Sequence, residues 1–564
     1  MTNAAAGTPR VPTAIDAIAN RHFARLLELS PEFATSLGLP GHETGYGDYS
    51  PAGTAARAEA ARGALAALEN QEPADATDAT TLDAMRERLG LELEIIATGI
   101  TELNNIACPA QGIRAIFDLM PRDTVEQWGH IAGRLRNVPA ALAGYTESLR
   151  HSLALGKVAA RRQVEIVAGQ ASGYATEDGF FHTLASGAAV AGGGGLPAAL
   201  SADLAEGAAL AAGAYRSFAR FLRAELHPSA PEKDAVGREY YALTSRLFLG
   251  ATVDLEETYH WGVEELDRLI AEQEKVAGQV RPGATIEEAK AVLNADPARQ
   301  LKGTEALRQW MQDKSDAAIA ALRDVHFDIP APMDRLECLI APTQEGGIYY
   351  TGPSDDFSRP GRMWWSVPAG EDDFTTWAET TTVYHEGVPG HHLQVGTATY
   401  RKDTLNDWRR HACWVSGHGE GWALYAERLM LDLGFLADPG DHMGMLDMQR
   451  MRAARVVFDI GVHLELEVPS RWGEGTWTAQ KGYDFLARHL DISEGQLNFE
   501  FARYLGWPGQ APAYKVGQRL WEQIRDARRR AEGEGFDLKA FHSEALGLGS
   551  VGLDTLRRAL LPQG

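Results

Sequence analysis

The sequence predicts a mainly α-helical protein with more than one lobe and one small β-sheet. Three observations predict this class. Long segments rich in Ala, Leu, Glu and Arg repeat apolar residues at helical spacing. The chain has 564 residues, well above the size at which a single hydrophobic core stops growing. One interior stretch has β character instead, and the composition, with 45% hydrophobic and 23% charged residues, is that of a folded soluble protein.

The helical pattern begins near the N-terminus and continues to the C-terminus. From residue 14 to about residue 69, short helical patterns alternate with turns, and residues 81–105 predict one long helix from their apolar spacing. Five further segments have the composition of helices. They are residues 125–169, 200–226, 255–279, 304–324 and 514–532.

Two segments interrupt this pattern. Residues 183–197 include four consecutive glycines, Gly192 to Gly195, which predict a flexible loop or hinge. No strand precedes this run and no Gly-Lys-Ser/Thr follows it, so a phosphate-binding loop is disfavoured. Residues 336–368 contain aromatic pairs around a Pro/Gly/Asp turn and predict a small sheet.

These interruptions divide the chain into three predicted segments. Residues 1–190 form an N-terminal helical lobe, and residues 198–335 continue the helical walls. Residues 336–564 contain the sheet and the helices of the candidate site. We expect the lobes to be interleaved rather than independent.

The charge balance narrows the classes of partner. The sequence has 54 Lys+Arg and 77 Asp+Glu, a formal net charge of −23. Such an acidic protein repels phosphate backbones and anionic lipids, which argues against nucleic acid and membrane surfaces. A small molecule or a short peptide is the expected substrate. The oligomeric state stays open, with a homodimer as one option.

Cysteine usage and the N-terminal sequence bear on location. Cys108, Cys338 and Cys413 are far apart and form neither a disulfide framework nor a CxxC motif, which is typical of a reducing compartment. The N-terminus has no basic start followed by an apolar core, and charges interrupt the later apolar runs before about 18 residues. We therefore expect a cytoplasmic protein.

The most informative segment is ETTTVYHEGVPGHHLQV, residues 379–395. His385-Glu386 followed by His391-His392 is similar to the zinc-hydrolase motif HExxH, in which two imidazoles and a carboxylate meet at the metal. The residue four positions after His385, however, is Pro389, which cannot bind a metal and would break a regular helix.

Two positions compete for the second ligand. If Val388 and Pro389 form a bulge, His391 returns to the position that a second ligand needs. His392 is seven residues from His385, about 10.5 Å along an unbroken helix, a distance that only a kink could shorten. We favour His391 and keep His392 as the alternative.

The segment HGEGWALYAERLM, residues 418–430, supplies a third ligand. Glu420 and Glu427 share a helical face, and Glu420 lies between two glycines, where the backbone can approach a metal closely. We predict Glu420 as the ligand. Glu427 is either an acceptor behind a ligand or an exposed helix residue.

Two clusters further along the chain extend the site. Arg455, Asp459 and His463 are spaced by four residues, as on one helical face, and form either part of the site or an ordinary salt bridge. Tyr514 either donates a hydrogen bond to a developing oxyanion or packs on the core. Most of the sheet aromatics suit packing. The candidate substrate contacts are Tyr350, Arg455, His463 and Lys515.

Several of these motifs together resemble the bacterial family called domain of unknown function 885. The similar segments are His385–Gln394, Glu420–Glu427, Pro508–Gly517, the Tyr349-Tyr350 pair with Ser358–Gly361, and Arg455–His463. More distantly, the family resembles helical zinc peptidases such as thimet oligopeptidase, angiotensin-converting enzyme and Taq carboxypeptidase. The resemblance implies two helical lobes around a deep cleft, with a small antiparallel β-sheet beside the metal-site helix.

The same resemblance implies a function. One Zn²⁺ would be held by His385, by His391 or His392, and by Glu420, with Glu386 as general base and Tyr514 as oxyanion stabiliser. We expect a zinc-dependent hydrolase of the metallopeptidase kind that cleaves a peptide or amide bond. Fe²⁺ is a less favoured metal, because two His and one carboxylate also describe non-haem iron sites. A metal enzyme specialised for one metabolite and a catalytically silent binding protein are competing hypotheses for the same residues.

Overall fold

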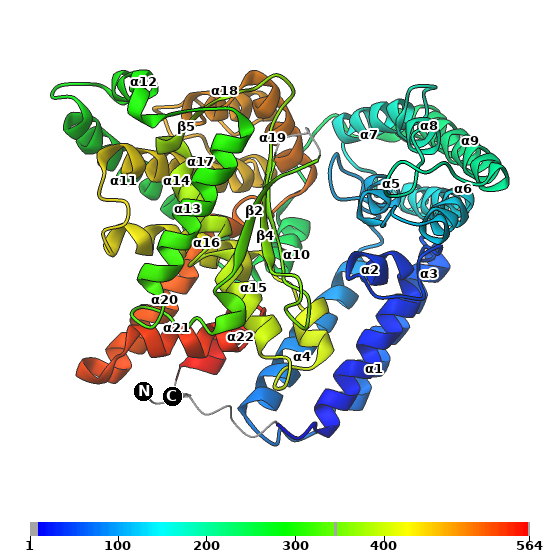
Figure 1. Cartoon of the computed structure of the whole chain (residues 1–564), viewed down its shortest axis with the longest axis horizontal. Helices are drawn as coiled ribbons and strands as arrows, with labels where there is room; N and C mark the ends of the chain where they lie inside the picture. Colours follow the sequence, from blue (N-terminus) through cyan, green and yellow to red (C-terminus); the bar gives the residue numbers. More distant parts are fainter. Residues whose placement is uncertain (1–9, 343–346, 562–564) are drawn as a thin grey trace.

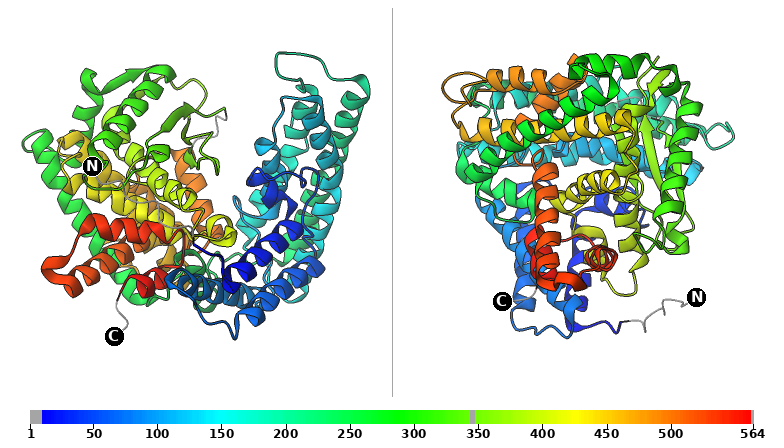
Figure 2. Two further views of the ribbon diagram at one scale, coloured as in Figure 1. Left: turned by 60° about the horizontal axis from the view of Figure 1, so that its bottom comes forward. Right: turned by 90° about the vertical axis from the view of Figure 1, so that its left-hand side faces the viewer.

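Helices make up most of the chain and are arranged in two bodies that meet along one edge (Figure 1; Figure 2, left). The computed structural model describes residues 10–342 and 347–561. Residues 1–9 of the predicted N-terminal lobe and residues 343–346 of the predicted β segment lie outside the described residues. The mainly α-helical, two-lobed fold predicted from the sequence is confirmed.

The smaller body, which we call the side lobe, lies at the upper right of Figure 1 and contains helices α5 to α9. The long helices α6 and α9 pack against each other, and α7 and α8 pack on α9. The bounds are α5 Pro109–Leu119, α6 Val125–Ala154, α7 Arg161–Tyr174, α8 Phe180–Ser186 and α9 Ala198–Phe221.

The larger body, which we call the main body, contains the chain from α10 onward. Helices α11 and α17 pack along each other, as do α16 and α20. The bounds are α10 Arg238–Leu249, α11 Leu255–Val280, α12 Ile286–Ala295, α13 Thr304–Leu322, α14 Thr376–Glu386, α15 His391–Tyr400, α16 Ser416–Asp432, α17 Pro439–Leu464, α18 Ala479–His489, α19 Glu494–Gly506, α20 Ala513–Glu532, α21 Leu538–Gly547 and α22 Leu553–Leu560.

The first four helices lie below the side lobe and beside the lower part of the main body, at the lower right of Figure 1. Their bounds are α1 Ala14–Leu29, α2 Pro31–Ser36, α3 Pro51–Leu68 and α4 Ala76–Ala97. Thr13 begins α1 with a capping box, in which its side chain accepts from the Asp16 N–H and Asp16 accepts from the Thr13 N–H. Helix α4 packs on α10 and α22, which ties the N-terminal helices to the main body.

Buried hydrophobic side chains form two separate cores in the described chain. One lies in the side lobe and is built from residues between 103 and 230. The other combines residues 15–89 with residues 241–560. The predicted segments 1–190 and 198–335 therefore each contribute to both cores.

A three-stranded sheet of order β2-β4-β3 flanks α14 and α15. Its strands are β2 Leu336–Ile340, β3 Gly347–Thr351 and β4 Gly361–Ser366. β3 and β4 are antiparallel, but β2 and β4 are parallel. The expectation of a purely antiparallel sheet is corrected: the chain reverses direction twice, and β4 then inserts between the two earlier strands. A second pair, β1 Gln300–Lys302 with β5 Asp373–Thr375, is antiparallel.

The predicted helices differ from the observed ones in two places. The segment 125–169 is interrupted between α6 and α7, where Gly156 has a φ of 70° that most side chains disfavour. The segment 81–105 is helical only to the end of α4 at Ala97. The glycine run 192–195 is a loop, as predicted. No helix in the described part of the chain is long and apolar enough to cross a bilayer.

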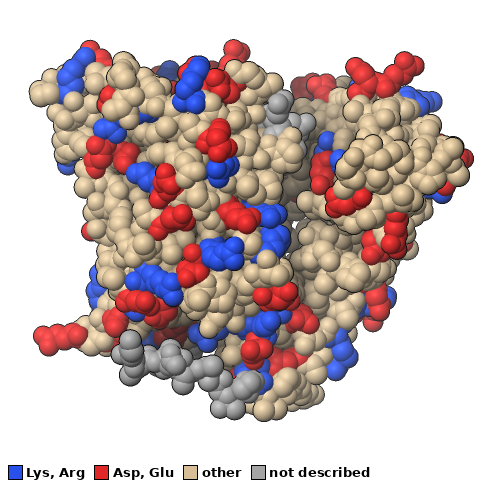
Figure 3. Space-filling view, viewed as in Figure 1, with Lys and Arg blue, Asp and Glu red and all other residues tan. Residues whose placement is uncertain are grey.

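A furrow separates the side lobe from the main body in the space-filling view, and charges of both signs are scattered over this face (Figure 3). A cavity of about 410 Å³ lies between the two bodies. Lys157 and Gln163 line it from the side lobe, and Tyr240 and Trp507 line it from the main body.

Candidate metal centre

A four-residue turn between α14 and α15 shapes the candidate site. Helix α14 ends at Glu386 and α15 begins at His391, so the expected bulged helix is in fact two helices. The N–H of Gly390 donates to the Tyr384 carbonyl at 3.1 Å, and Trp422 Nε1 donates to the Pro389 carbonyl at 2.8 Å. A Cβ on Gly390 would lie 1.9 Å from the His385 carbonyl oxygen, so the turn requires glycine there.

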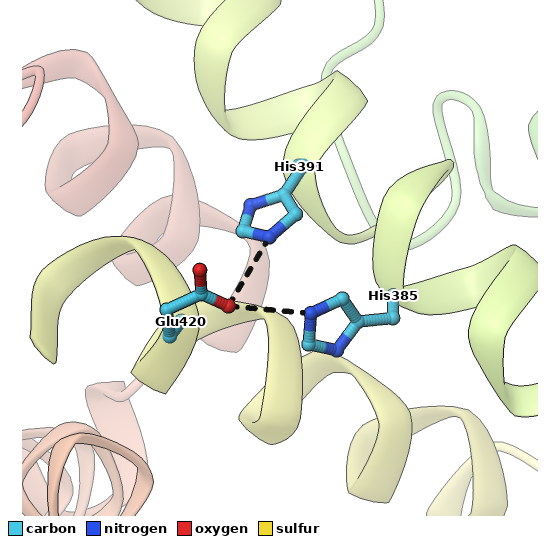
Figure 4. A group of neighbouring side chains, drawn as sticks. All are labelled: His385, His391 and Glu420. Atoms are coloured by element: carbon cyan, nitrogen blue, oxygen red, sulfur yellow. Dashed lines mark ion pairs between the residues drawn. The ribbon is translucent and has the colours of Figure 1, made fainter. Parts of the chain in front are cut away.

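The turn brings together the three predicted ligands (Figure 4). His385 Nε2 and His391 Nε2 lie 3.4 and 3.5 Å from the same Glu420 oxygen, Oε2. The two imidazole rings are 4.9 Å apart and nearly perpendicular. One potential ligand atom from each residue lies within 4.8 Å of the others, and no other such group occurs in residues 10–342 and 347–561. This arrangement has the spacing that a metal ion needs.

His392, the competing ligand position, lies outside this cluster. Its Nε2 donates to the Met333 carbonyl at 2.8 Å, and its Nδ1 accepts from the Tyr350 hydroxyl at 3.0 Å. Burial lowers the pKa of His392 to about 4. Both ring nitrogens thus have partners, and His392 connects α15 to the sheet.

A buried chain of hydrogen bonds supports His385 from behind. His385 Nδ1 donates to Glu427 Oε1 at 2.7 Å, and Glu427 Oε2 accepts from Gln449 Nε2 at 3.4 Å. Gln449 Oε1 in turn accepts from Lys515 Nζ at 2.6 Å. Burial acts to raise the pKa of Glu427. The hydrogen bond and the charge of His385 lower it by more in total with its other neighbours, so the pKa lies below its ordinary value. Glu427 therefore orients the His385 ring with its Nε2 toward the cluster, as acceptors behind metal ligands do.

The ionisation of the cluster reflects the close approach of its members. Burial alone would lower the pKa of His385, but the Glu420 and Glu427 carboxylates raise it to about 10. The same contacts, with His385 and His391, hold the pKa of Glu420 well below its ordinary value despite burial. Glu420 is therefore an anion facing two imidazoles.

Glu386 is the last residue of α14 and lies beside the cluster. Its side chain is buried, and its carboxylate has no hydrogen bond with another residue in the described ranges. Burial raises its pKa, while His391 and His385 act in the opposite direction. A carboxylate with a raised pKa and no fixed partner is suited to accept a proton.

Glycines on two helices place Tyr514 near Glu420. A Cβ on Gly421 of α16 would lie 2.5 Å from the Gly517 backbone of α20, so these two helices touch through their backbones. Gly421 thus serves the packing of α16 on α20, while a Cβ on Gly419 would lie 2.5 Å from the Trp414 ring. Burial and the Glu420 carboxylate raise the pKa of Tyr514. The Arg455 guanidinium lies 5.3 Å from the centre of the Tyr514 ring.

Three of the expected substrate contacts have partners within the protein. His463 is fully buried and its Nε2 donates to the Tyr504 carbonyl at 3.1 Å. Lys515 is buried and pairs with Glu265 at 2.9 Å, and the Tyr350 hydroxyl bonds to His392. These three groups are thus already engaged inside the protein, and their contact with a substrate stays a prediction. Arg455 also has internal partners: its Nε donates to the Tyr504 hydroxyl at 2.5 Å, and its Nη2 pairs with Glu500 at 3.3 Å.

Sequence reasoning missed Gln449 and Arg452. Both lie on α17, three residues apart, and Arg455 follows at the same spacing. Residues three apart share a helical face, so the position of Arg455 was the signal that could have found them. The charges that act on Arg452 include Glu427, Tyr514 and Glu420.

The fold and site define a class: a two-bodied helical protein with a buried His–His–Glu cluster on its central helices. The chain belongs to the family of bacterial proteins of unknown function known as DUF885, whose family model matches residues 31–560. This confirms the family resemblance. The resemblance to helical zinc peptidases stays a prediction. Comparison with curated proteins gave no match.

Two solved structures are similar in fold. One, from Colwellia psychrerythraea, matches with a TM-score of 0.83 and 21% sequence identity, and the match covers 97% of this chain and 99% of the Colwellia chain. The other, from Shewanella oneidensis, has a TM-score of 0.73 and 16% identity, with the same coverage.

Both structures carry the description "putative lipoprotein". This finding contradicts the expected cytoplasmic location. Cysteine usage was a weak indicator of location for a physical reason. A chain with two large hydrophobic cores needs no disulfides for stability, so a lack of disulfides does not indicate in which compartment the protein folds.

Proposed function

We propose that this protein is a metal-dependent hydrolase, with zinc as the metal, that cleaves a peptide or amide bond in a small or peptide-like substrate. The observation that carries the proposal is the convergence of His385, His391 and Glu420 with Glu386 beside them. Two imidazoles and one carboxylate form a typical ligand set of catalytic zinc, which keeps a further position for water or substrate.

The residues fit a metal on three counts. His385 is oriented by Glu427 so that its Nε2 faces Glu420. His391 Nε2 faces the same oxygen, and its buried Nδ1 has no hydrogen-bond partner among the described residues. Glu420 is held as an anion by its neighbours. A metal ion at this point would neutralise the Glu420 carboxylate and accept the lone pairs of the two Nε2 atoms that face it.

Bound zinc supplies acidity to a water molecule and polarises a carbonyl group. Glu386 is the residue of the chain that takes the water's proton, because its carboxylate is near the cluster and has no other hydrogen bond. The same group then returns the proton to the leaving amine. The Tyr514 hydroxyl, at the start of α20, donates a hydrogen bond to the oxygen that gains negative charge.

Replacement of Glu386 by Gln tests the proposal. Gln keeps the shape but cannot accept the proton, so kcat should fall by about 10²–10⁴-fold, while zinc content stays near one ion per chain. The measurements are hydrolysis of a panel of dipeptides and blocked peptides, together with elemental analysis of protein purified without added metal.

Glu534→Gln is a matched control, since Glu534 is exposed and remote in sequence from the site; it should keep full activity. Full activity in Glu386→Gln would overturn the role of Glu386. Iron in the purified protein, with oxygen consumption, would indicate an oxygenase instead.

A further inference from the structure

A buried arginine beside the candidate centre forms no ion pair among the described residues. Arg452 is 8% exposed, and it lies on α17 between Gln449, which contacts Glu427, and Arg455, which lies over Tyr514. The spacing of three residues places it on the same helical face as these two. Unlike Arg455, which pairs with Glu500 at 3.3 Å, Arg452 forms no ion pair in the described chain.

The donors of Arg452 are mostly unused. In the described ranges, the hydrogen bond of its guanidinium runs from Nη1 to the Met448 carbonyl at 3.3 Å, and its buried Nε has no partner. A guanidinium has five N–H donors in a planar fork. The carboxylates of Glu427 and Glu420 act on Arg452 without forming an ion pair with it in the described chain. Arg452 also acts on the carboxylates of Glu386 and Glu500.

A buried charge without a partner is costly and calls for compensation. The Glu420 side chain is 19% exposed and Tyr514 is half-buried, so the cluster beside Arg452 is not closed off from the surface. Arg134 and Arg409 are likewise buried without an ion pair in the described chain. Of the three, Arg452 is the one on which the charges of Glu427 and Glu420 act. The missing partner is an anion that enters from outside.

We propose that Arg452, assisted by Arg455, binds a carboxylate of the substrate, so that the protein acts on peptides or amides that carry a carboxylate near the scissile bond. The inference rests on the proposed hydrolase function. The planar guanidinium fork matches a carboxylate with two parallel hydrogen bonds. The carboxylate is either the C-terminal group of a peptide or an acidic side chain, and the test separates these sources.

The first test compares kcat/KM for each peptide as free acid and as C-terminal amide, and for amidated peptides with Glu or Gln next to the scissile bond. In one of these two pairs, the zinc-loaded wild type should show a kcat/KM for the peptide with the carboxylate that is about tenfold or more above that for the neutral peptide. Arg452→Gln should bring that ratio close to one, because the loss of kcat/KM should fall on the peptide that carries the carboxylate. The control Arg530→Gln, at an exposed arginine of α20, should keep the wild-type ratio.

An unchanged ratio in Arg452→Gln, or a wild type that prefers neither carboxylate, would overturn the inference. If Arg452→Gln does not fold, as judged by thermal unfolding, Arg452→Lys takes its place, since lysine keeps the charge and loses the fork. Its ratio should fall several-fold.

A second test does not depend on catalysis. Calorimetry of the full chain after chelation of metal should show that N-acetylglycine binds and N-acetylglycinamide does not, with at least tenfold weaker binding in Arg452→Gln. If the zinc-loaded wild type hydrolyses no peptide, the proposed function fails, and this binding result still decides the inference. Equal binding by wild type and variant would reject it.

Discussion

His391 and His392 are neighbours in the sequence, yet their rings have different surroundings. The His391 ring turns to Glu420, while the His392 ring lies between Met333 and Tyr350. Adjacent residues on a helix point about 100° apart, so only one of the two can face a given point. The spacing in the sequence left this choice open, and the turn at Gly387–Gly390 decides it.

Alanine at each histidine should separate metal binding from stability. His391→Ala should lose zinc binding. His392→Ala should keep zinc and reduce the free energy of unfolding by about 1–3 kcal/mol, because the Met333 carbonyl loses its donor. Zinc content and urea unfolding measure the two effects. Retention of zinc by His391→Ala, with loss in His392→Ala, would reverse the assignment.

At the scale of elements, the turn between α14 and α15 holds the two histidines together. It is anchored on both sides, by Tyr384 from α14 and by Trp422 from α16. Trp422 lies two residues after Glu420, so one short stretch of α16 supplies both a candidate ligand and an anchor of the turn. Displacement of this turn would move His391 relative to His385.

Gly390→Ala should disrupt the turn. The added Cβ would meet the His385 carbonyl oxygen, which belongs to the backbone and cannot move aside. We expect a loss of about 3 kcal/mol in stability together with weaker zinc binding. Gly195→Ala is the control, because a Cβ at Gly195 meets nothing within 4 Å. Normal zinc affinity in Gly390→Ala would show that the turn tolerates the shift.

Asp459 joins three elements and gives the main body a pH dependence. Its Oδ2 accepts from the Tyr241 hydroxyl of α10 at 2.6 Å and from the Gly509 N–H at 2.8 Å. Its buried Oδ1 has no hydrogen-bond partner in the described chain, and burial raises the pKa of Asp459 from 3.8 to about 7. The folded state therefore favours the protonated form.

The sign of the effect follows from this shift. Because the folded pKa exceeds the unfolded one, the contribution to stability is complete below about pH 4 and is lost as the pH rises to about 7. The loss should be about 2–4 kcal/mol, and Asp459→Asn should remove it. Urea unfolding between pH 4 and 8 measures the difference. Asp178→Asn, at an exposed site, should behave as wild type. If the free energy of unfolding of Asp459→Asn depended on pH as it does in the wild type, the raised pKa of Asp459 would be refuted.

At the scale of the whole molecule, the described chain contains two hydrophobic cores, and the candidate centre belongs to only one of them. The side-lobe core uses residues 103–230, and the helices that carry the site pack in the other core. A ligand stabilises the part of a protein that it binds. Metal should therefore affect the two bodies unequally.

Hydrogen exchange with and without zinc tests this division. Zinc should slow exchange in α14, α15 and α16 and leave α6 and α9 unchanged, and calorimetry should show that only the main-body transition rises in temperature. The side lobe serves as an internal control. Equal protection of both bodies would mean that they unfold as one unit.

The sequence by itself determined the helical class and the loop at Gly192–Gly195, and it predicted a cluster of His385, Glu420 and one of the two neighbours His391 and His392. It could do so because helical periodicity, glycine runs and motif spacing are local properties. It left Glu427 as either an acceptor or an exposed residue, and the structure shows the acceptor of a hydrogen bond from His385.

Only the tertiary structure decided the rest. It separated His391 from His392, paired β2 with β4 in parallel, placed Gly421 against α20, and buried Arg452 without an ion pair among the described residues. Each of these depends on contacts between segments far apart in the chain. Local spacing cannot specify them, because the direction of a side chain and its burial are set by the elements that pack against it.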